Sequence, residues 1–336
     1  MSDHVIGVDG GNSKTEVAVA TVGGRLLAQV RGGGVDTPLT APEEWRKHVV
    51  SLVERAKRMA GVKRGQRSLC AVYLMANIDT PAERRAAHRE LSAAGLAEQT
   101  VVGNDTIAVL RAGCSRGWGV AVVAGAGINA VGRHPSGRSA GFLALGDYTG
   151  DRGGGAYVAI QALAAAVRSR DGRGPATVLA KALPAYYGMR TPSQLAVAIR
   201  RGVVDDDGLL RLAPLVLAAA AVDPVAARIV DDLADEVATM AGALIRRLHL
   251  TRSDVEVVLG GGILQAASRA FTDRVTHAVA STSRRAQVRV LDVTPVYGAL
   301  AEAYDRVDAT AHARSRARRA LQVNVADDDP HDECTA

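Results

Sequence analysis

The sequence predicts an α/β protein with mixed sheets, built from two halves that open in the same way. Short apolar strands alternate with amphipathic helices along most of the 336 residues, which is the pattern of α/β folds. The order strand, glycine hairpin, strand, turn, strand occurs near the N-terminus and again from residue 120, which indicates a duplication. Because the length also exceeds that of an ordinary domain, we expect two domains.

The first half begins with three strands. A short apolar strand at 5–9 breaks at Gly10–Ser13, a second strand follows at 15–21, and Gly23-Gly24 turns it into a third at 25–31,. Helical spacing of apolar residues then predicts a helix. The other elements expected in this half are a helix at 42–59, a buried strand at 70–74, a helix from Pro81, a strand end at 101–102 and a helix from 104 to 110.

The second half repeats the opening and then adds helices. Its expected strands are 120–123, 129–132 and 138–142, with breaks at 125–127 and 135–137. A helix-rich insertion is expected at 156–168, 175–183, 192–200, 209–221 and 224–248, followed by strands at 255–259 and 288–291. We expect the closing helix 296–305 to pack back on the first half. The predicted division is 1–115 plus about 293–310, then 116–292, with a disordered tail at 311–336.

Charge and cysteine content narrow the class of protein. The formal charge of +6 is concentrated in the arginine-rich run 312–319, which could meet nucleic acid or anionic membrane,. An acidic stretch, 327–333, follows at once, so we favour a solvated helix end and expect no nucleic-acid or membrane partner. Cys70, Cys114 and Cys334 show no metal-binding spacing,. With no signal peptide or membrane span expected, the predicted location is the cytoplasm.

Glycine turns at strand ends are the first candidates for chemistry. Asp9 ends a strand, and the residues after it can present successive backbone N–H groups to an anion. A carboxylate beside such a nest suggests Mg²⁺ held through water, although a hairpin with a capping Asp explains the pattern equally well. The residues of this turn are Gly10, Gly11, Asn12, Ser13, Lys14 and Thr15.

Two further glycine runs support binding of phosphate and nucleotide. Gly125, Ala126 and Gly127 form an equivalent hairpin in the second half, and a pair of such hairpins favours a phosphate chain held between them. Gly260, Gly261 and Gly262 end a strand before a helix, where α/β sheets bind nucleotides,. A tight strand–helix turn explains that run as well.

Two acidic residues open helices. Asn104-Asp105 follows a strand, and Gly150-Asp151 lies in a glycine-rich turn. Taken alone, each aspartate is explained as a helix N-cap.

In this order and spacing, the segments make the chain resemble the N-acetylglucosamine kinase family and the related BadF/BadG/BcrA/BcrD-type ATPases of the actin/hexokinase/Hsp70-like superfamily. The resemblance runs from Val5 to about Tyr304. It is carried by Gly7–Thr15, Asn104-Asp105, Gly125–Asn129, Gly150-Asp151 and Leu259–Gly262.

The resemblance implies two RNase H-like domains with an interdomain nucleotide cleft and ATP-dependent phosphorylation of an amino sugar, N-acetylglucosamine first, at its 6-hydroxyl. Asp105 would be the general base, Asp9 would hold Mg²⁺ through water, and the backbone at 10–15 and 125–127 would cradle the phosphates. Gly260–Gly262 would face the adenosine. The implied sugar-binding residues are Asp36, Asn104, Asp105, Asn129 and Asp151, and the implied assembly is a homodimer.

The chain departs from the family pattern in three places. Ala126 and Ile128 stand where the family hairpin carries Thr and Ser, Arg152 stands where it carries Glu after Asp151, and Asp36 stands where Asn-like residues are common. The alternatives are therefore a non-catalytic regulator that binds ATP or sugar, or a kinase for N-acetylmuramic acid or glucosamine. Retention of Asp105 favours an enzyme.

Overall fold

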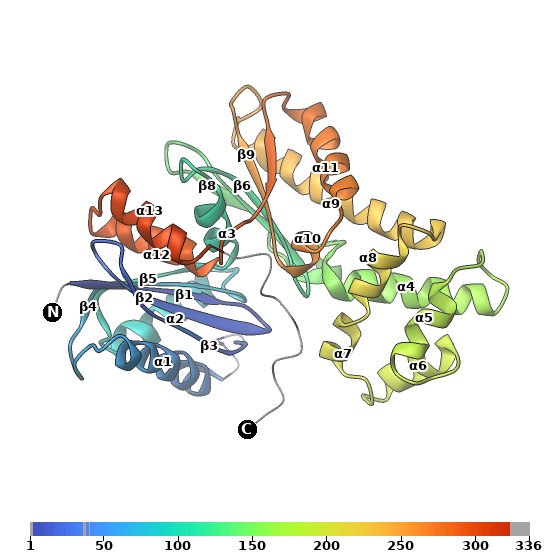
Figure 1. Cartoon of the computed structure of the whole chain (residues 1–336), viewed down its shortest axis with the longest axis horizontal. Coiled ribbons are helices and arrows are strands. Elements are labelled where there is room, and N and C mark those ends of the chain that lie inside the picture. Colours follow the sequence, from blue (N-terminus) through green and yellow to red (C-terminus); the bar gives the residue numbers. More distant parts are fainter. Residues whose placement is uncertain (1–2, 36–37, 40, 323–336) are drawn as a thin grey trace.

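Two five-stranded mixed sheets form the centre of the molecule, with helices around them (Figure 1). The computed structural model describes residues 3–35, 38–39 and 41–322. The strand order is β3-β2-β1-β4-β5 in the first sheet and β8-β7-β6-β9-β10 in the second. In each, the first strand lies between an antiparallel hairpin partner and a parallel neighbour. The predicted repeat therefore extends to all five strands of both sheets.

The first sheet is buried on both faces. Its strands are β1 (His4–Gly10), β2 (Lys14–Thr21), β3 (Leu26–Gly33), β4 (Ser68–Met75) and β5 (Ala97–Asn104). Successive side chains of a strand point to opposite faces: Ile6 and Val8 join the core of α1 (Pro42–Met59) and α2 (Pro81–Ala93). Val5 joins the core of α3 (Thr106–Gly113) and α12 (Val296–Arg306).

The second sheet consists of β6 (Gly119–Ala124), β7 (Ile128–Arg133), β8 (Ser139–Gly141), β9 (Glu256–Gly260) and β10 (Gln287–Val290). Helix α3 packs between the two sheets, because its Val109 lies in one hydrophobic cluster with Val72 of β4 and Val258 of β9. The helix that begins at Asp105 is thus part of the contact between the halves.

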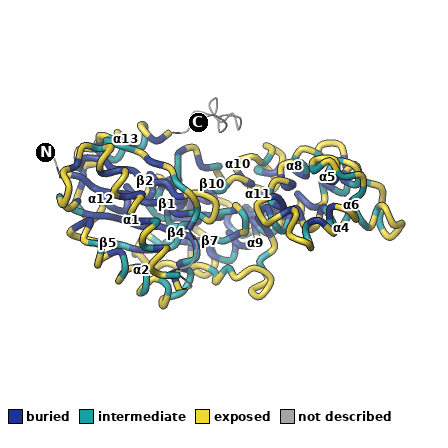
Figure 2. The backbone as a smooth tube through the Cα atoms, turned by 90° about the horizontal axis from the view of Figure 1, so that it is seen from below, coloured by how far each residue is buried: buried dark blue, intermediate teal, exposed yellow. Residues whose placement is uncertain are grey.

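A helical insertion separates β8 from β9 and lies away from the first sheet, where Figure 2 shows more exposed chain. It comprises the 3-10 turn η1 (Gly146–Tyr148), α4 (Gly154–Arg170), α5 (Leu179–Tyr186), α6 (Pro192–Arg200), α7 (Asp206–Leu210), α8 (Ala213–Ala219) and α9 (Pro224–Arg247). After β9 come α10 (Gly262–Gln265) and α11 (Arg269–Thr282).

Two helix predictions in the insertion are wrong in detail. The helix expected at 175–183 starts at Leu179, because Asp223 accepts hydrogen bonds from Thr177 Oγ1 and Val178 N and holds 177–178 outside the helix. The single helix expected at 209–221 is two, and the second has Pro214 in its first turn. Proline lacks the N–H that a continuing helix needs, so it starts a new one.

The closing helix packs on the first sheet as expected. A Cβ at Gly7 would lie 2.7 Å from Leu300 N, so β1 and α12 are in close contact. The C-terminal part of the chain therefore packs on the first half. The exact domain boundaries stay a prediction.

The disorder expected from residue 311 is wrong for the part of the tail that the structure describes. Helix α13 (Ala311–Ala320) is capped by Thr310 and buries Ala313 and Ala317. Arg314 and Arg318 form ion pairs with Asp305 and Asp292, so part of the basic run neutralises acidic groups of the same chain. Residues 323–336, including Cys334 and the acidic stretch, lie outside the described residues.

Among the described residues, no single helix has the length and apolar composition needed to cross a bilayer. The helical segments 206–219 and 224–247 meet the length and composition criteria only when they are taken together, and the pair is bent by 108°.

Candidate active site

The carboxyl ends of three parallel strands bring the predicted catalytic residues together. Gly10 of β1 is in register with Met75 of β4, which is in register with Asn104 of β5. Asp9 and Asp105 therefore lie at the same edge of the first sheet, the edge at which α/β folds bind ligands.

Asp105 occupies the N-cap position of α3 but does not cap it. Its side chain makes no capping hydrogen bond, and its backbone is already helical. Asn104 caps instead, since its Oδ1 accepts from Thr106 N at 3.0 Å. The carboxylate of Asp105 is partly exposed and is not needed as the cap. Burial and then the charge of Asp79 raise the pKa of Asp105 to about 7, so a proton-accepting carboxylate titrates near neutrality.

Asp9 lies beside it in a crowded acidic environment. Burial, followed by the charges of Asp105 and Glu16, raises the pKa of the Asp9 carboxyl well above its ordinary value, and Lys14 opposes the shift. A bound cation would relieve this repulsion.

The first glycine turn connects β1 to β2. Gly11 N donates to Lys14 O at 2.8 Å and closes the turn. Asn12, Ser13 and Lys14 are exposed, whereas Gly10 and Thr15 are buried in the strand ladder. Contact with phosphate is therefore expected at residues 11–14. Lys14 Nζ lies 3.3 Å from Glu16 Oε1, which keeps a positive charge close to Asp9.

The second glycine turn is held by the start of α4. Gly155 N and Ala156 N donate to the carbonyls of Gly125 and Ala126, at 2.8 and 3.1 Å. A Cβ at Gly125 or Gly127 would meet no atom within 4 Å, and neither residue has a positive φ. Packing within the protein does not require glycine at these two positions, whereas close approach of a ligand to the backbone would.

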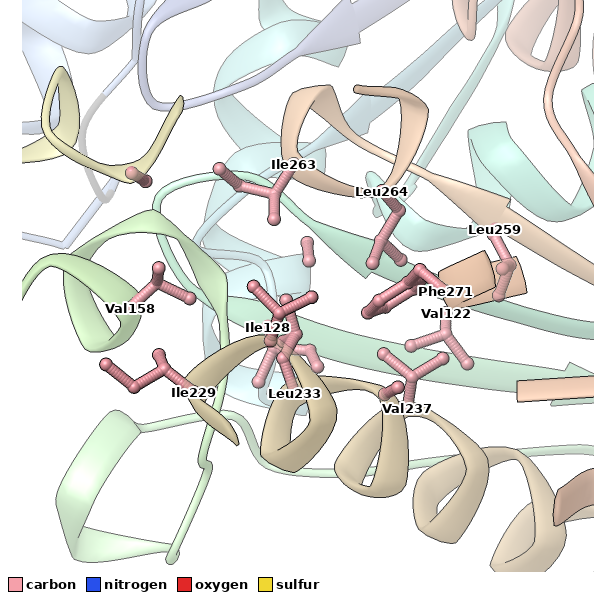
Figure 3. Packing of buried hydrophobic residues seen from close by; sticks show 14 of the residues in the cluster. Val122, Ile128, Val158, Ile229, Leu233, Val237, Leu259, Ile263, Leu264 and Phe271 are labelled. Atoms are coloured by element: carbon pink, nitrogen blue, oxygen red, sulfur yellow. The ribbon is translucent and has the colours of Figure 1, made fainter. Parts of the chain in front are cut away.

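The third glycine run divides into structural and open positions. A Cβ at Gly261 would lie 2.4 Å from Ala124 O, and its φ is +86°; Gly260 packs against Val109 of α3. Gly262 has open space where a side chain would be. The residues that follow the turn anchor it, because Ile263 and Leu264 are packed in the hydrophobic core of the second half (Figure 3).

A cavity of about 560 Å³ reaches Ala266, at the end of the short helix α10 that follows this run. Ala266, which borders it, donates its N–H to Gly262 O at 3.0 Å. Its other walls come mainly from alanine and aliphatic residues of α8 and α9, together with Phe271 of α11. An apolar pocket of this size can hold a flat heterocycle, and none of the three glycines is among its lining residues.

The predicted sugar-side residues come from both sheets. Asn104 ends β5, and Asn129 lies in β7 next to the second glycine turn. Asp151 is tied to its own turn, since it accepts from Thr149 Oγ1 at 2.5 Å. Asp36 lies outside the described residues.

A model of the BadF/BadG/BcrA/BcrD ATPase family matches residues 6–303 of the chain. The chain belongs to this family. The resemblance inferred from the sequence is confirmed, and so is the predicted fold class, which the solved structures below share.

A curated relative of this BadF/BadG-type ATPase is the N-acetylmuramic acid/N-acetylglucosamine kinase of Clostridium acetobutylicum. It is 27% identical over 266 residues, which cover 78% of this chain and 85% of the relative. A candidate N-acetylglucosamine kinase from Chromobacterium violaceum has a similar structure, with a TM-score of 0.68 and 24% identity over 89% of this chain and 98% of the other. A ROK family glucokinase from Streptomyces griseus, solved with glucose and AMPPNP, has a TM-score of 0.54 and 19% identity over 90% and 98% of the two chains.

Sequence reasoning missed two polar residues of this ATPase at the end of β4. Asn77, at φ +61°, donates from Nδ2 to Asn12 Oδ1 at 2.8 Å and so fastens the first glycine turn to β4. Asp79 accepts hydrogen bonds from Asn104 and Asn129. The missed signal was the same one that identified Asp9 and Asp105, namely polar residues directly after a buried parallel strand.

Proposed function

We propose that this protein is an ATP-dependent sugar kinase that phosphorylates the 6-hydroxyl of an N-acetylhexosamine, with N-acetylglucosamine as the expected acceptor. One observation carries the proposal. Asn104 caps helix α3 in place of Asp105, and the Asp105 carboxylate lies at the carboxyl ends of the parallel strands, near the glycine turns that we expect to bind phosphate. The curated relative phosphorylates N-acetylmuramic acid and N-acetylglucosamine, which supports the choice of acceptor.

The reaction needs alignment more than covalent chemistry. The sugar oxygen attacks the γ-phosphorus of ATP, a new O–P bond forms, the bond to the bridging oxygen breaks, and ADP leaves. Asp105 accepts the hydroxyl proton as the bond forms. Because phosphoryl transfer passes through a loose transition state, placing the hydroxyl in line and neutralising the phosphate charge supply most of the rate enhancement.

The two glycine turns account for the phosphate grip. Gly11 N and Gly125 N donate to Lys14 O and Gly127 O within their own turns. The backbone donors for phosphate would therefore come from 12–14 and 126–127, and Lys14 adds a positive charge. The family departure at Ile128 removes no contact to a ligand, because that side chain is buried in the core against Gly153. Of the departures that favour a non-catalytic regulator, this one is weakened, whereas those at Ala126, Arg152 and Asp36 are unchanged.

The residues present fit a magnesium ion. Asp9 is a partly exposed carboxylate whose pKa is raised first by burial and then by the charges of Asp105 and Glu16. Mg²⁺ takes few protein carboxylates, with phosphate oxygens and water completing its shell. The ion would neutralise phosphate charge next to Asp9. The cavity bordered by Ala266 would receive the adenine, and Asn129 and Asp151 would bind sugar hydroxyls. Cytoplasmic location and a homodimer stay predictions.

Sugar-dependent ADP release tests the function. The purified protein is incubated with MgATP and a panel of N-acetylglucosamine, N-acetylmuramic acid, glucosamine and glucose, and the phosphorylated carbon is identified by ³¹P–¹H NMR. We expect turnover of an N-acetylhexosamine with phosphate at carbon 6. ADP release that no sugar accelerates would overturn the proposal and favour a regulator.

A further inference from the structure

Asp79 stands on a rigid support between β4 and α2. Its backbone N–H donates to Glu83 Oε2 at 2.9 Å, and so does the N–H of Thr80 at 2.8 Å. Thr80 and Glu83 form the capping box of α2. Because the cap that starts the helix also holds its backbone, Asp79 projects from a fixed point.

Its carboxylate joins side chains from the two sheets. Asp79 Oδ1 accepts from Asn104 Nδ2 of the first sheet at 2.9 Å and from Asn129 Nδ2 of the second at 3.4 Å. The longer contact is the one that crosses between the halves. This single oxygen thus connects the two carboxamides that the resemblance places at the sugar.

The orientation of both carboxamides is determined by their other hydrogen bonds. Asn104 Oδ1 accepts from Thr106 N at 3.0 Å, and Asn129 Oδ1 accepts from Ala130 N at 2.7 Å. With each oxygen committed to a backbone donor, each NH₂ group must face Asp79. One N–H of each group satisfies Asp79, and the second N–H remains for a substrate oxygen.

The same carboxylate adds charge to the site. The charge of Asp79 raises the pKa of Asp105, and the charges of Glu83 and Asp151 raise the pKa of Asp79. On the β1 side, Asp9 lies near Asp105, and Glu16 and Lys14 lie near Asp9. Burial and these neighbours raise the pKa of Asp79 to about 6. It is therefore ionised at neutral pH, when it disfavours ionisation of Asp105.

We propose that Asp79 is a positioning residue of the sugar site, which holds Asn104 and Asn129 with their donors aimed at the acceptor sugar and so makes sugar binding depend on both halves together. This role rests on the proposed kinase function. It assigns to Asp79 a specific effect on the sugar and none on ATP, because its hydrogen bonds go to the two carboxamides and not to the glycine turns.

Two substitutions separate its two contributions. Asp79→Ala removes both the acceptor and the charge, and we expect the KM for sugar to rise about tenfold or more, since hydrogen bonds to a charged group are lost, with the KM for ATP unchanged. Asp79→Asn keeps an acceptor oxygen, so its KM effect should be smaller. Both variants should shift the acid limb of kcat/KM to lower pH, because a negative charge beside Asp105 is gone.

Gln194→Ala provides the matched control, because Gln194 Oε1 accepts from Arg190 N and Thr191 N in the capping box of α6, as Glu83 does in α2, but makes no contact with Asp79. It weakens the capping box and should lower the melting temperature, but it should leave the acid limb and the sugar KM near wild type. Calorimetric titration of N-acetylglucosamine into each protein gives a readout independent of turnover. A folded Asp79→Ala protein with wild-type sugar affinity and an unshifted pH profile overturns this role alone. A wild-type protein that neither binds nor phosphorylates any sugar overturns the kinase proposal together with it.

Discussion

At the scale of single residues, the decisive feature is that Asn104, and not Asp105, caps helix α3. The amide side chain supplies the helix cap, and the carboxylate one residue later remains uncapped and partly exposed. From sequence alone, an aspartate at a helix start is explained as a cap. Only the arrangement of both side chains shows that Asp105 is not needed for that purpose.

The raised pKa of Asp105 predicts an acid limb in the pH profile. A general base must be ionised to act, and with a pKa of about 7 the ionised fraction falls about tenfold for each pH unit below that value. We expect kcat/KM for the sugar to decline below about pH 7 and to level off above it. Steady-state rates measured from about pH 5.5 to pH 8.5 check this, and a profile that stays flat down to about pH 5.5 would be incompatible with Asp105 as the base.

The residues that the sequence did not reveal have a common reason. Asp79 and Asn77 lie in a short connection whose geometry depends on β4 lying between β1 and β5. Strand order is a property of the assembled sheet. Once that order is known, the residues after three parallel strands lie at one edge of the sheet, and the polar residues after β4 become a third group of site candidates.

At the scale of elements, local signals predicted most boundaries. Helix α1 begins and ends where its proline and its amphipathic spacing place it, at Pro42 and Met59. Errors arose where the deciding contact is distant in sequence, as for Asp223 at the start of α5, or where a helix is short and polar. In α13 the overlooked signal was the spacing of Ala313, Ala317 and Leu321, which places them on one buried face,.

Two neighbouring glycines should respond oppositely to the same substitution. Gly262→Ala meets open space, so we expect a normal melting temperature and weaker ATP binding, with a KM for ATP raised several-fold. Gly261→Ala would place its Cβ 2.4 Å from Ala124 O at a positive φ, so it should destabilise the fold by roughly 1–3 kcal/mol. Thermal unfolding and ATP titration of both variants check the pair; equal ATP affinity in wild type and Gly262→Ala would remove this turn from the nucleotide site.

At the scale of the whole molecule, the halves share a core and an ion network, so they are mechanically connected. Glu302 of α12 pairs with Arg111 of α3, with Nε to Oε1 at 2.8 Å, and with Arg133 of β7 in the second sheet. The side chains of Glu302 and Arg111 are 11% and 10% exposed. Glu302 thus connects two guanidinium groups across the boundary between the sheets, and Asp305 also pairs with Arg111.

Removing that carboxylate should destabilise the protein. Glu302→Gln leaves Arg133 without this counter-charge and Arg111 with Asp305 alone. Loss of one partner of a buried ion pair costs about 3–5 kcal/mol, and the remaining pair with Asp305 should bring the cost toward the lower end of that range. We expect a lower midpoint in urea unfolding followed by circular dichroism. Arg173→Gln, which breaks an exposed ion pair with Asp171, is the control and should change stability by less than about 1 kcal/mol. Equal midpoints for the two variants would show that the network contributes little.

The central claim, that Asp105 is the base of a sugar kinase, is tested most directly by comparing Asp105→Asn with wild type in one assay of sugar-dependent ADP release, alongside titration of each protein with ATP. The account predicts that the variant binds ATP as wild type does and loses turnover by at least about a hundredfold, the scale of general-base catalysis. Wild-type turnover in a variant that binds ATP normally would contradict the account, because the carboxylate would then have no part in the reaction.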